Sequence, residues 1–406
     1  MKVSHLALGV TGALLFSQQG WSVGYEKPIF WSGKYSGTGG AAVSSVNNAD
    51  ALYFNPAGLA KSSSGTEAIL NFSPTITKMS APVLVANTPM DSKSSFSPIG
   101  SVMLSHQVAP GFGVGLGLYT AGGLGVDYGD VNVGATYPAL LKTKLSDMEV
   151  SLGAGLQVHP MLSLGAAWRI SMFSADFTSL NGSTGINSRF LSHSGSQWSG
   201  FRFGAQFGPE DGNWGLGAAL RTSVALKGTG TGTAYSVATG TETSIGVTSL
   251  ETSLPLQASL GGHFMAADDI KILLQYDFTQ YVNNRTLDIT VAGVLTKSAM
   301  NWKNRQDIRV GGEYTGLKNW PVRLGYVYTS AVTPTDYPNP YFTPPGAVNT
   351  FTLGTGTQIA TDLTLDGALD YTVGSATGTP NASAGTLAGV YKATAYALHT
   401  GLSYRF

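Results

Sequence analysis

The sequence has 406 residues, of which only 11% are charged, whereas charged residues make up about a quarter of an ordinary soluble domain. Lys and Arg together number 23, as do Asp and Glu, so no basic excess indicates a nucleic-acid partner. The chain has no Cys, which excludes disulfides, thiolate metal sites and Cys nucleophiles. Its mean hydropathy of +0.08, without long apolar runs, excludes a bundle of membrane-spanning helices.

Residues 1–24 have the organisation of a secretory signal peptide. Lys2 provides a basic start, an apolar stretch runs from Leu6 to Phe16, and small residues follow. The apolar stretch is too short to span a bilayer. We therefore expect an exported protein that is cleaved after Ser22 or after Gly24.

Residues 25–65 precede the first predicted strand and contain one compact, helix-like stretch, NNADALYFNPAGLA, at positions 47–60. Asn55 is a favourable helix N-cap, and Pro56 suits the first helical position, where its missing N–H costs nothing. The segment is too apolar to remain in solvent and too short to form a domain. We expect it to fold as a plug, or hatch, into the space that the strands enclose. Its expected packing residues include Phe54 and Leu59.

From residue 66 to residue 406 most of the chain alternates with a period of two. Between Leu162 and Met172 every second residue is apolar, and residues 270–279 and 322–329 show the same pattern. The second face consists mainly of Gly, Ala, Ser and Thr, whereas a soluble strand would carry more charge there. A membrane β-barrel accounts for both faces, because one meets lipid and the other lines a polar or filled lumen.

Six tight turns alternate with seven longer polar stretches along this region. The turns lie at residues 109–111, 159–161, 209–212, 266–269, 316–320 and 360–362, and the longer stretches at 79–93, 123–143, 180–196, 228–246, 287–298, 333–348 and 376–390. This alternation predicts 14 antiparallel strands, with both chain ends on the short-turn side. The last strand continues to Phe406. Closure of the barrel is required because an open sheet edge in lipid would leave backbone groups without hydrogen bonds.

Two groups of side chains are candidates for contact with a transported molecule. The alternation places the basic residues Arg169, Arg202, Lys303, Arg309 and Arg323 on the lumenal face, with Arg305 and the acids Asp277, Asp307, Glu313, Asp366 and Asp370. Because acids and bases share this face, we expect a salt-bridge network, with binding of a substrate carboxylate as the alternative. The apolar candidates for capture in a predicted water-facing loop are Tyr137, Leu140 and Leu141. Their alternative role is to cap the core of the barrel.

Enzymatic signatures are missing from the sequence. The six His residues are scattered and none belongs to a His-Glu-x-x-His motif, and there is no Gly-x-Ser-x-Gly nucleophile elbow. Glycines at every second position of residues 111–117 indicate a strand and not a phosphate-binding loop. We therefore expect no catalytic residue, no metal and no cofactor. A barrel hydrolase with an unsignatured Ser/His pair is the enzymatic alternative.

Several motifs together resemble one family. Residues 32–34 (SGK), 37–42 (GTGGAA) and 49–60 (ADALYFNPAGLA) are similar to the N-terminal hatch of the FadL family of outer-membrane long-chain fatty acid and hydrocarbon transporters. The Asn-Pro-Ala signature of that family falls on Asn55, Pro56 and Ala57. Residues 137–145 and 162–166 are similar to the region of its third and fourth strands, and residues 254–256, 301–304 and 320–321 to its later hairpins. The chain departs from the family at residues 134–137 and 343–346, which puts a charge-based contact with a substrate carboxylate in doubt.

The resemblance implies an all-β, 14-stranded antiparallel transmembrane barrel with a short helical hatch in its lumen, present as a monomer in the outer membrane of a Gram-negative bacterium. It also implies passive transport of a hydrophobic small molecule, which is captured at the extracellular loops and leaves through the barrel wall when the hatch shifts. Asn55, Pro56, Ala57, Phe54 and Leu59 would form the hatch and its gate. The other partners would be outer-membrane lipid and lipopolysaccharide.

Two further classes of function are compatible with a barrel. A general polar-solute porin would not need residues 25–65 and would have a more charged lumen, and a surface adhesin or receptor barrel would have larger loops. The sequence does not distinguish fatty acids from alkanes or monoaromatic compounds as substrates, because all three need the same apolar lining.

Overall fold

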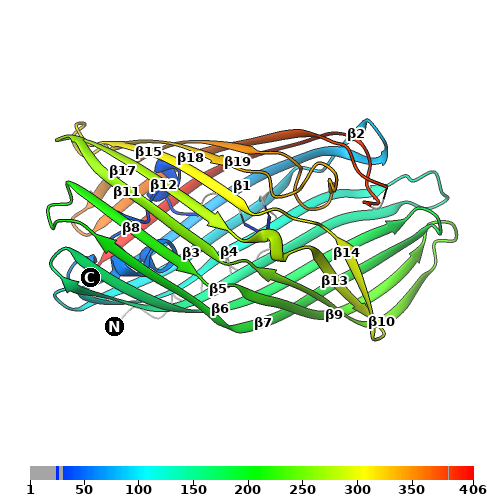
Figure 1. Cartoon of the computed structure of the whole chain (residues 1–406), viewed down its shortest axis with the longest axis horizontal. Helices are drawn as coiled ribbons and strands as arrows, with labels where there is room; N and C mark the ends of the chain where they lie inside the picture. Colours follow the sequence, from blue (N-terminus) through cyan, green and yellow to red (C-terminus); the bar gives the residue numbers. More distant parts are fainter. Residues whose placement is uncertain (1–23, 27–30, 383) are drawn as a thin grey trace.

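One closed antiparallel sheet makes up most of the computed structural model, which describes residues 24–26, 31–382 and 384–406. The sheet closes because β1 (Thr66–Val85) pairs with the last strand, β19 (Gly389–Arg405). Figure 1 shows the resulting barrel of long, tilted strands, with the C-terminus at the end of the barrel that carries the short turns. The predicted signal peptide lies, except for Gly24, outside the described residues.

The sheet contains 19 strand segments, which form a ring of 14 wall strands, so the predicted strand count is confirmed. Four wall strands are each interrupted once, and β2 extends the hairpin between β1 and β3. The uninterrupted wall strands besides β1 and β19 are β3 (Ser95–Ala109), β4 (Phe112–Val131), β5 (Ala139–His159), β6 (Leu162–Asn181), β7 (Ile186–Phe207), β16 (Val322–Thr329), β17 (Val348–Ala360) and β18 (Leu363–Gly378). The remaining segments are β2 (Thr88–Asp91) and the four pairs β8 (Trp214–Arg221) with β9 (Val224–Ser236), β10 (Glu242–Leu254) with β11 (Gln257–Ala267), β12 (Ile270–Thr279) with β13 (Thr286–Val291), and β14 (Val294–Ala299) with β15 (Arg305–Tyr314).

Six short turns join the wall strands at one end of the barrel and seven connections join them at the other, at the positions predicted. Most of the seven connections are shorter than predicted. For example, β4 continues to Val131 and β5 begins at Ala139, so the loop covers residues 132–138 and not 123–143. The physical reason is that backbone groups beyond the bilayer still pair with each other, and Ser and Thr side chains are as compatible with a strand as with a loop.

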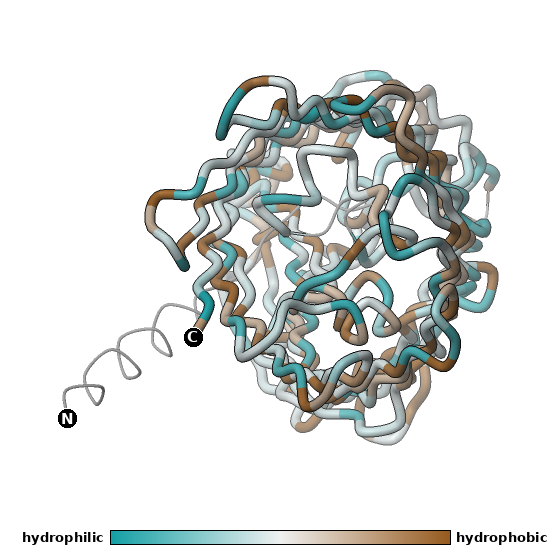
Figure 2. The backbone as a smooth tube through the Cα atoms, turned by 90° about the vertical axis from the view of Figure 1, so that its left-hand side faces the viewer, coloured by the Kyte–Doolittle hydropathy of each residue, from teal (hydrophilic) through white to brown (hydrophobic). Residues whose placement is uncertain are grey.

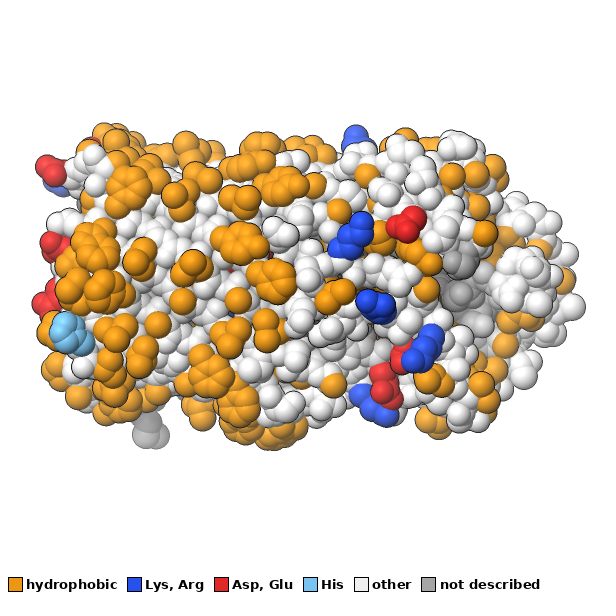
Figure 3. Space-filling view, viewed as in Figure 1, with side chains coloured by type: hydrophobic (Ala, Val, Ile, Leu, Met, Phe, Trp, Pro, Cys, Tyr) orange, Lys and Arg blue, Asp and Glu red, His pale blue; other side chains and the backbone are white. Residues whose placement is uncertain are grey.

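The apolar face of the strands points away from the lumen. Leu164 and Met172 of β6 are exposed, as are Leu353 of β17 and Leu398 of β19. On the face drawn in Figure 3, hydrophobic side chains cover the half of the barrel nearest the short turns, and charged side chains lie beyond them toward the long loops. This is the pattern of a barrel that meets hydrocarbon with its outer surface.

The N-terminal segment (residues 31–62) occupies the lumen in the half nearest the short turns. It contains η1 (Tyr35–Thr38), α2 (Ala51–Phe54) and η2 (Pro56–Lys61), and most of its residues are buried. η2 packs on β4, β5, β6 and β7, whereas η1 packs on β15, β16, β17 and β18. In the end-on view of Figure 2 the chain accordingly crosses the inside of the ring. One further 3-10 turn, η3 (Tyr281–Asn283), separates β12 from β13.

Within the described residues, no helix is both long and apolar enough to cross a membrane.

Candidate functional site

Asn55 ties the N-terminal segment to the wall. Its side-chain oxygen accepts a hydrogen bond from the Ala57 N–H at 3.1 Å and so caps η2, in which Pro56 takes the first position. Its Nδ2 donates to the carbonyl oxygens of Val43 at 2.7 Å, Ala205 at 2.9 Å and Ala218 at 3.3 Å. Because Ala205 belongs to β7 and Ala218 to β8, one amide group links the cap to two wall strands.

Bare glycines on neighbouring strands make room for the Asn-Pro-Ala turn. A Cβ atom on Gly204 of β7 would overlap the Asn55 side chain, and one on Gly165 of β6 would overlap the backbone of Pro56 and Ala57. On β5, a Cβ atom at Gly155 would come within 2.7 Å of the Pro56 carbonyl oxygen. Glycine within a strand commonly marks such a close backbone approach.

The remaining hatch candidates lie in an apolar cluster between the segment and the wall. Leu59 and Leu52 are fully buried there beside Met103 of β3. Phe54 is half-buried at the edge of the cluster, where its ring packs edge-on against Tyr35 at a centroid distance of 5.3 Å. The segment therefore has a core of its own that it shares with the wall.

Asp50 is a buried acid at the start of α2. It accepts hydrogen bonds from Ser32 Oγ at 2.8 Å and from Asn71 Nδ2 of β1 at 3.1 Å. Burial raises the pKa of Asp50 to about 6, and the two hydrogen bonds oppose this rise. The side chain thus joins two parts of the N-terminal segment to the first strand of the wall.

A layer of buried ion pairs crosses the lumen on the long-loop side of the N-terminal segment. Its pairs are Arg169 with Glu149 at 2.6 Å, Arg221 with Glu26, Arg305 with Asp307 at 3.1 Å, and Arg309 with Asp277 at 2.5 Å. A separate cluster lies at the short-turn end of the lumen, where Arg323 pairs with Asp366 at 2.6 Å and with Glu313 at 2.8 Å beside Gly37 of η1. Such charges are stable in a dry interior only when they are paired. The arginines of this layer are therefore paired with acids of the same chain.

Arg202 couples this layer to the N-terminal segment. Its Nη1 donates to the carbonyl oxygen of Leu52 at 3.0 Å and also to that of Tyr53, at the end of α2. Its guanidinium lies 4.6 Å from the centroid of the Tyr53 ring. Arg202 thereby binds the carbonyl end of this short helix.

Lys303 does not lie in the lumen, contrary to the prediction. It is exposed in the irregular segment between β14 and β15. The neighbouring Trp302 is buried instead, so the period-two alternation does not extend through this interruption. Arg305, at the start of β15, is the lumenal cation nearest in sequence.

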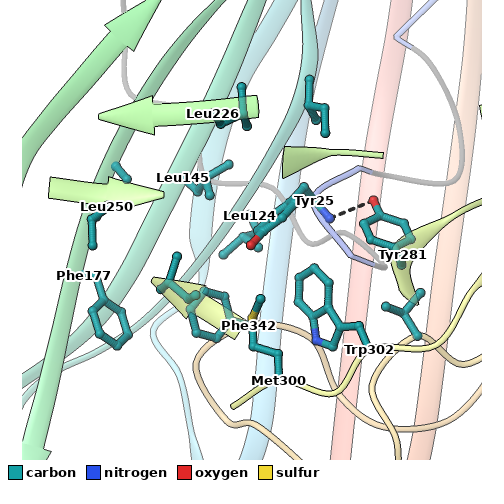
Figure 4. Packing of buried hydrophobic residues seen from close by; sticks show 14 of the residues in the cluster. Tyr25, Leu124, Leu145, Phe177, Leu226, Leu250, Tyr281, Met300, Trp302 and Phe342 are labelled. Carbon is teal, nitrogen blue, oxygen red and sulfur yellow. Dashed lines mark hydrogen bonds between the residues drawn. The ribbon is translucent and has the colours of Figure 1, made fainter. Parts of the chain in front are cut away.

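An apolar cluster fills the lumen beyond the ion pairs, toward the long loops. Figure 4 shows members of this cluster pointing toward one another, among them Phe177 of β6, Trp302 of the segment between β14 and β15, and Phe342 of the loop before β17. The order of residues along single strands fixes the sequence of layers. On β6, Phe173 of the cluster is followed toward the short turns by Arg169 at 0% exposure and then by Gly165 against Pro56. The same order holds on β5, from Leu145 through Glu149 to Gly155.

Tyr25 lies where the pairing of β4 with β5 is irregular. The register shifts between Thr120 and Gly122, and Gly123 N–H donates to the Tyr25 carbonyl oxygen at 2.8 Å. Tyr25 N–H donates to Tyr281 Oη at 2.9 Å, the bond drawn in Figure 4, and the Tyr25 ring lies 4.8 Å from Trp302. The Gly123 N–H of β4 thus finds its acceptor in Tyr25, which precedes the first wall strand in the sequence. The sequence reasoning did not find this contact, because the two residues are far apart along the chain.

The predicted capture residues do not all lie in a loop. Tyr137 is in the loop of residues 132–138 and is 42% exposed, whereas Leu140 and Leu141 belong to β5. Leu141 is fully buried in an apolar cluster with Met79 and Tyr391 near the long-loop end of the lumen. Loop placement was therefore wrong for Leu140 and Leu141, since β5 begins before them.

The structure also brings together Ser73, His399 and Asp370 on β1, β19 and β18. His399 Nδ1 lies 2.9 Å from Ser73 Oγ, and His399 Nε2 lies 2.7 Å from Asp370 Oδ2. All three side chains are buried, and the Trp31 ring lies 6.0 Å from the imidazole. The pairing of β1 with β19 is interrupted at Ser73 and His399, and this side-chain contact links the two strands there. A fully buried Ser73 hydroxyl has no access to a substrate, so the arrangement is a structural contact and not a hydrolase site.

The closed barrel, its filled lumen and its apolar outer belt define the class of the protein as an outer-membrane β-barrel. Residues 30–406 match the family model described as outer membrane protein transport protein (OMPP1/FadL/TodX), and the chain belongs to this family. It is accordingly an outer-membrane transport protein of a Gram-negative bacterium and not an enzyme.

Solved structures share the fold at low sequence identity. A FadL homologue of Pseudomonas aeruginosa is 17% identical, with a TM-score of 0.82 over 94% of this chain and 100% of that chain. The toluene transporter TodX of Pseudomonas putida is 16% identical, with a TM-score of 0.76 over 93% and 99%. The toluene transporter TbuX of Ralstonia pickettii is also 16% identical, with a TM-score of 0.72 over 93% and 99%. No curated protein matches the sequence.

Proposed function

We propose that the protein carries hydrophobic small molecules, either long-chain fatty acids or related hydrocarbons, passively across the outer membrane. The molecule is captured at the long loops, enters the apolar cluster in the lumen, and leaves through the barrel wall when the N-terminal segment shifts as a hatch. Tyr137 takes part in capture. Two solved relatives in structure are named as toluene transporters, which supports the hydrocarbon class.

The layer of buried ion pairs is the observation that carries this proposal. An apolar molecule gains about 0.8 kcal/mol per buried methylene in the apolar cluster, but gains nothing of this kind among charges. Movement straight along the axis would also require breaking pairs such as Arg169–Glu149, whose side chains are both at 0% exposure. A route that stays apolar must therefore turn sideways before it reaches the ion pairs.

The irregular pairing of β4 is our candidate for the sideways exit. Gly122 and Gly123 lie beside Tyr25 at the level where the apolar cluster meets the charged layer. Neither glycine has a side chain to close the wall there. Release of Tyr25 would free the Gly123 N–H and open a path from the lumen to the lipid.

Gly123→Trp tests the exit. Gly123 faces the lipid, since it pairs with the outward-facing Ser146, so the indole would cover the proposed opening from outside. We expect uptake of radiolabelled long-chain fatty acid and of toluene by cells that lack a transporter of this kind to fall about tenfold or more. Gly312→Trp is the matched control, because Gly312 of β15 also faces outward and has no wall atom closer than 4.0 Å to an added Cβ. Equal uptake by the two variants would exclude an exit at β4.

We also propose that residues 1–24 are removed as a signal peptide and that residues 25–65 act as the hatch, with Asn55, Pro56 and Ala57 as its fixed turn. The contacts of Asn55 with β7 and β8 support a turn that stays in place while other parts of the segment move. A general porin is the competing function, and it would conduct ions freely. A surface adhesin or receptor barrel would transport neither ions nor hydrophobic molecules.

A further inference from the structure

A groove crosses the lipid-facing surface where the first and last strands meet. Its volume is about 560 Å³, and its apolar lining includes Ile76, Phe96, Phe351, Leu369, Tyr396 and Leu398. The groove follows from the sequence of β1, because Pro74 faces Pro98 of β3 and the pairing with β19 omits Pro74. The compact rings of Pro74 and Pro98 thus leave space at a position where neighbouring strands carry larger side chains.

Large side chains, four of them aromatic, form one row across the groove. Phe96, Ile76, Tyr396, Tyr371 and Phe351 are direct cross-strand neighbours on β3, β1, β19, β18 and β17. The rings of Tyr371 and Tyr396 lie 4.9 Å apart. Tyrosines gather in this way at the border of the apolar belt, where the ring meets hydrocarbon and the hydroxyl meets polar headgroups.

A lysine stands on the long-loop side of this row. Lys392 shares the outward face of β19 with Tyr396, and four residues of strand place it about 13 Å further along. Its direct neighbours are Ser80 of β1 and Ser375 of β18. Within the described residues Lys392 forms no ion pair, whereas the nearby Lys78 pairs with Asp91 at 2.6 Å.

We propose that this surface binds one phosphorylated lipid of the outer leaflet, with its acyl chains in the groove and a phosphate on Lys392 and Ser375. The occupant is a lipid because the groove opens into the hydrocarbon and ends at a polar patch. It is anionic because Lys392 has no acid partner within the described residues, while the neighbouring acid Asp91, opposite Ser80, is already paired with Lys78. A long lysine side chain can keep its stem on the apolar surface and place its charge at the headgroups. The site is separate from the transport route through the lumen.

Native mass spectrometry of the full-length, detergent-purified protein tests the site. The probes are bis-phosphorylated lipid A, the same lipid without phosphates, and inorganic phosphate. For Lys392→Gln we expect about fivefold weaker binding of the phosphorylated lipid, the effect of about 1 kcal/mol per lysine at a membrane surface, and unchanged binding of the dephosphorylated lipid. Leu398→Trp fills the groove and should weaken binding of both lipids. Lys392→Arg should bind as the wild type does.

Lys227→Gln is the matched control, since Lys227 is an outward lysine on β9 that already pairs with Glu251. Each variant is first checked for folding by its heat-modifiable mobility on a gel. The proposal is overturned if Lys392→Gln and Lys227→Gln weaken lipid binding equally. It is also overturned if Leu398→Trp leaves lipid binding unchanged, or if inorganic phosphate binds as tightly as the phosphorylated lipid.

Discussion

Asn55 satisfies four backbone groups with one side chain, since its oxygen accepts from Ala57 N–H while its amide nitrogen donates to three carbonyl groups. Aspartate would cap η2 equally well, but an ionised carboxylate cannot donate a hydrogen bond. The Asn-Pro-Ala turn therefore requires Asn and not Asp because of the hydrogen bonds to the wall strands, and not because of the helix cap. The sequence could predict the cap, which depends on residues close in sequence, but not the contacts with β7 and β8.

Asp50 makes the stability of the N-terminal segment depend on pH. Its pKa is raised from 3.8 to about 6, so the closed segment binds a proton more readily than the opened segment does. The contribution of Asp50 to the stability of the closed segment is therefore fully present below pH 3.8. It is lost as the pH rises toward about 6, by about 3 kcal/mol in total. We expect hydrogen exchange of residues 47–61, corrected for the intrinsic rate, to become faster across this range in the wild type.

Asp50→Asn removes the titrating group and retains a side chain that can bond to Ser32 and Asn71. The opening free energy of this variant should therefore depend much less on pH than that of the wild type. Asp268→Asn, at an exposed turn residue, serves as the control and should keep the dependence of the wild type. An undiminished pH dependence in Asp50→Asn would show that another group is responsible.

At the scale of elements, turns and strands were predictable because their chemistry is local. A turn such as residues 209–212 is recognisable from its own Pro and Gly, and the outward apolar face of β6 from its own alternation. Pairings between distant residues were not predictable. Glu26 contacts Arg221 and Ser73 contacts His399, although each pair is far apart in the sequence, and no local sequence pattern indicates which strands become neighbours.

Glycines on the wall strands position the N-terminal segment, and this gives a prediction for Gly204. In Gly204→Leu the new side chain overlaps Asn55, so we expect the turn to leave β7 while the barrel still folds through its unchanged outer face. Steady ion conductance in planar bilayers should rise at least severalfold over the wild type. Gly312→Leu, which faces lipid, should conduct as the wild type does. Equal conductance of both variants would show that the Asn-Pro-Ala turn does not close the lumen.

At the scale of the whole molecule, the lumen is divided into an apolar layer, a charged layer and the N-terminal segment. The charged layer and the N-terminal segment act against two different kinds of solute. The paired charges exclude apolar molecules from the axis, and the buried segment leaves little room for hydrated ions. A barrel of this construction should be selective for hydrophobic molecules that can leave sideways.

The most direct test combines two measurements on the same purified wild-type protein. In planar bilayers we expect ion conductance close to the background, and in proteoliposomes we expect faster uptake of a long-chain fatty acid or of toluene than in protein-free vesicles. Large, steady ion conductance without faster uptake of either hydrophobic probe would contradict the account and indicate a general porin.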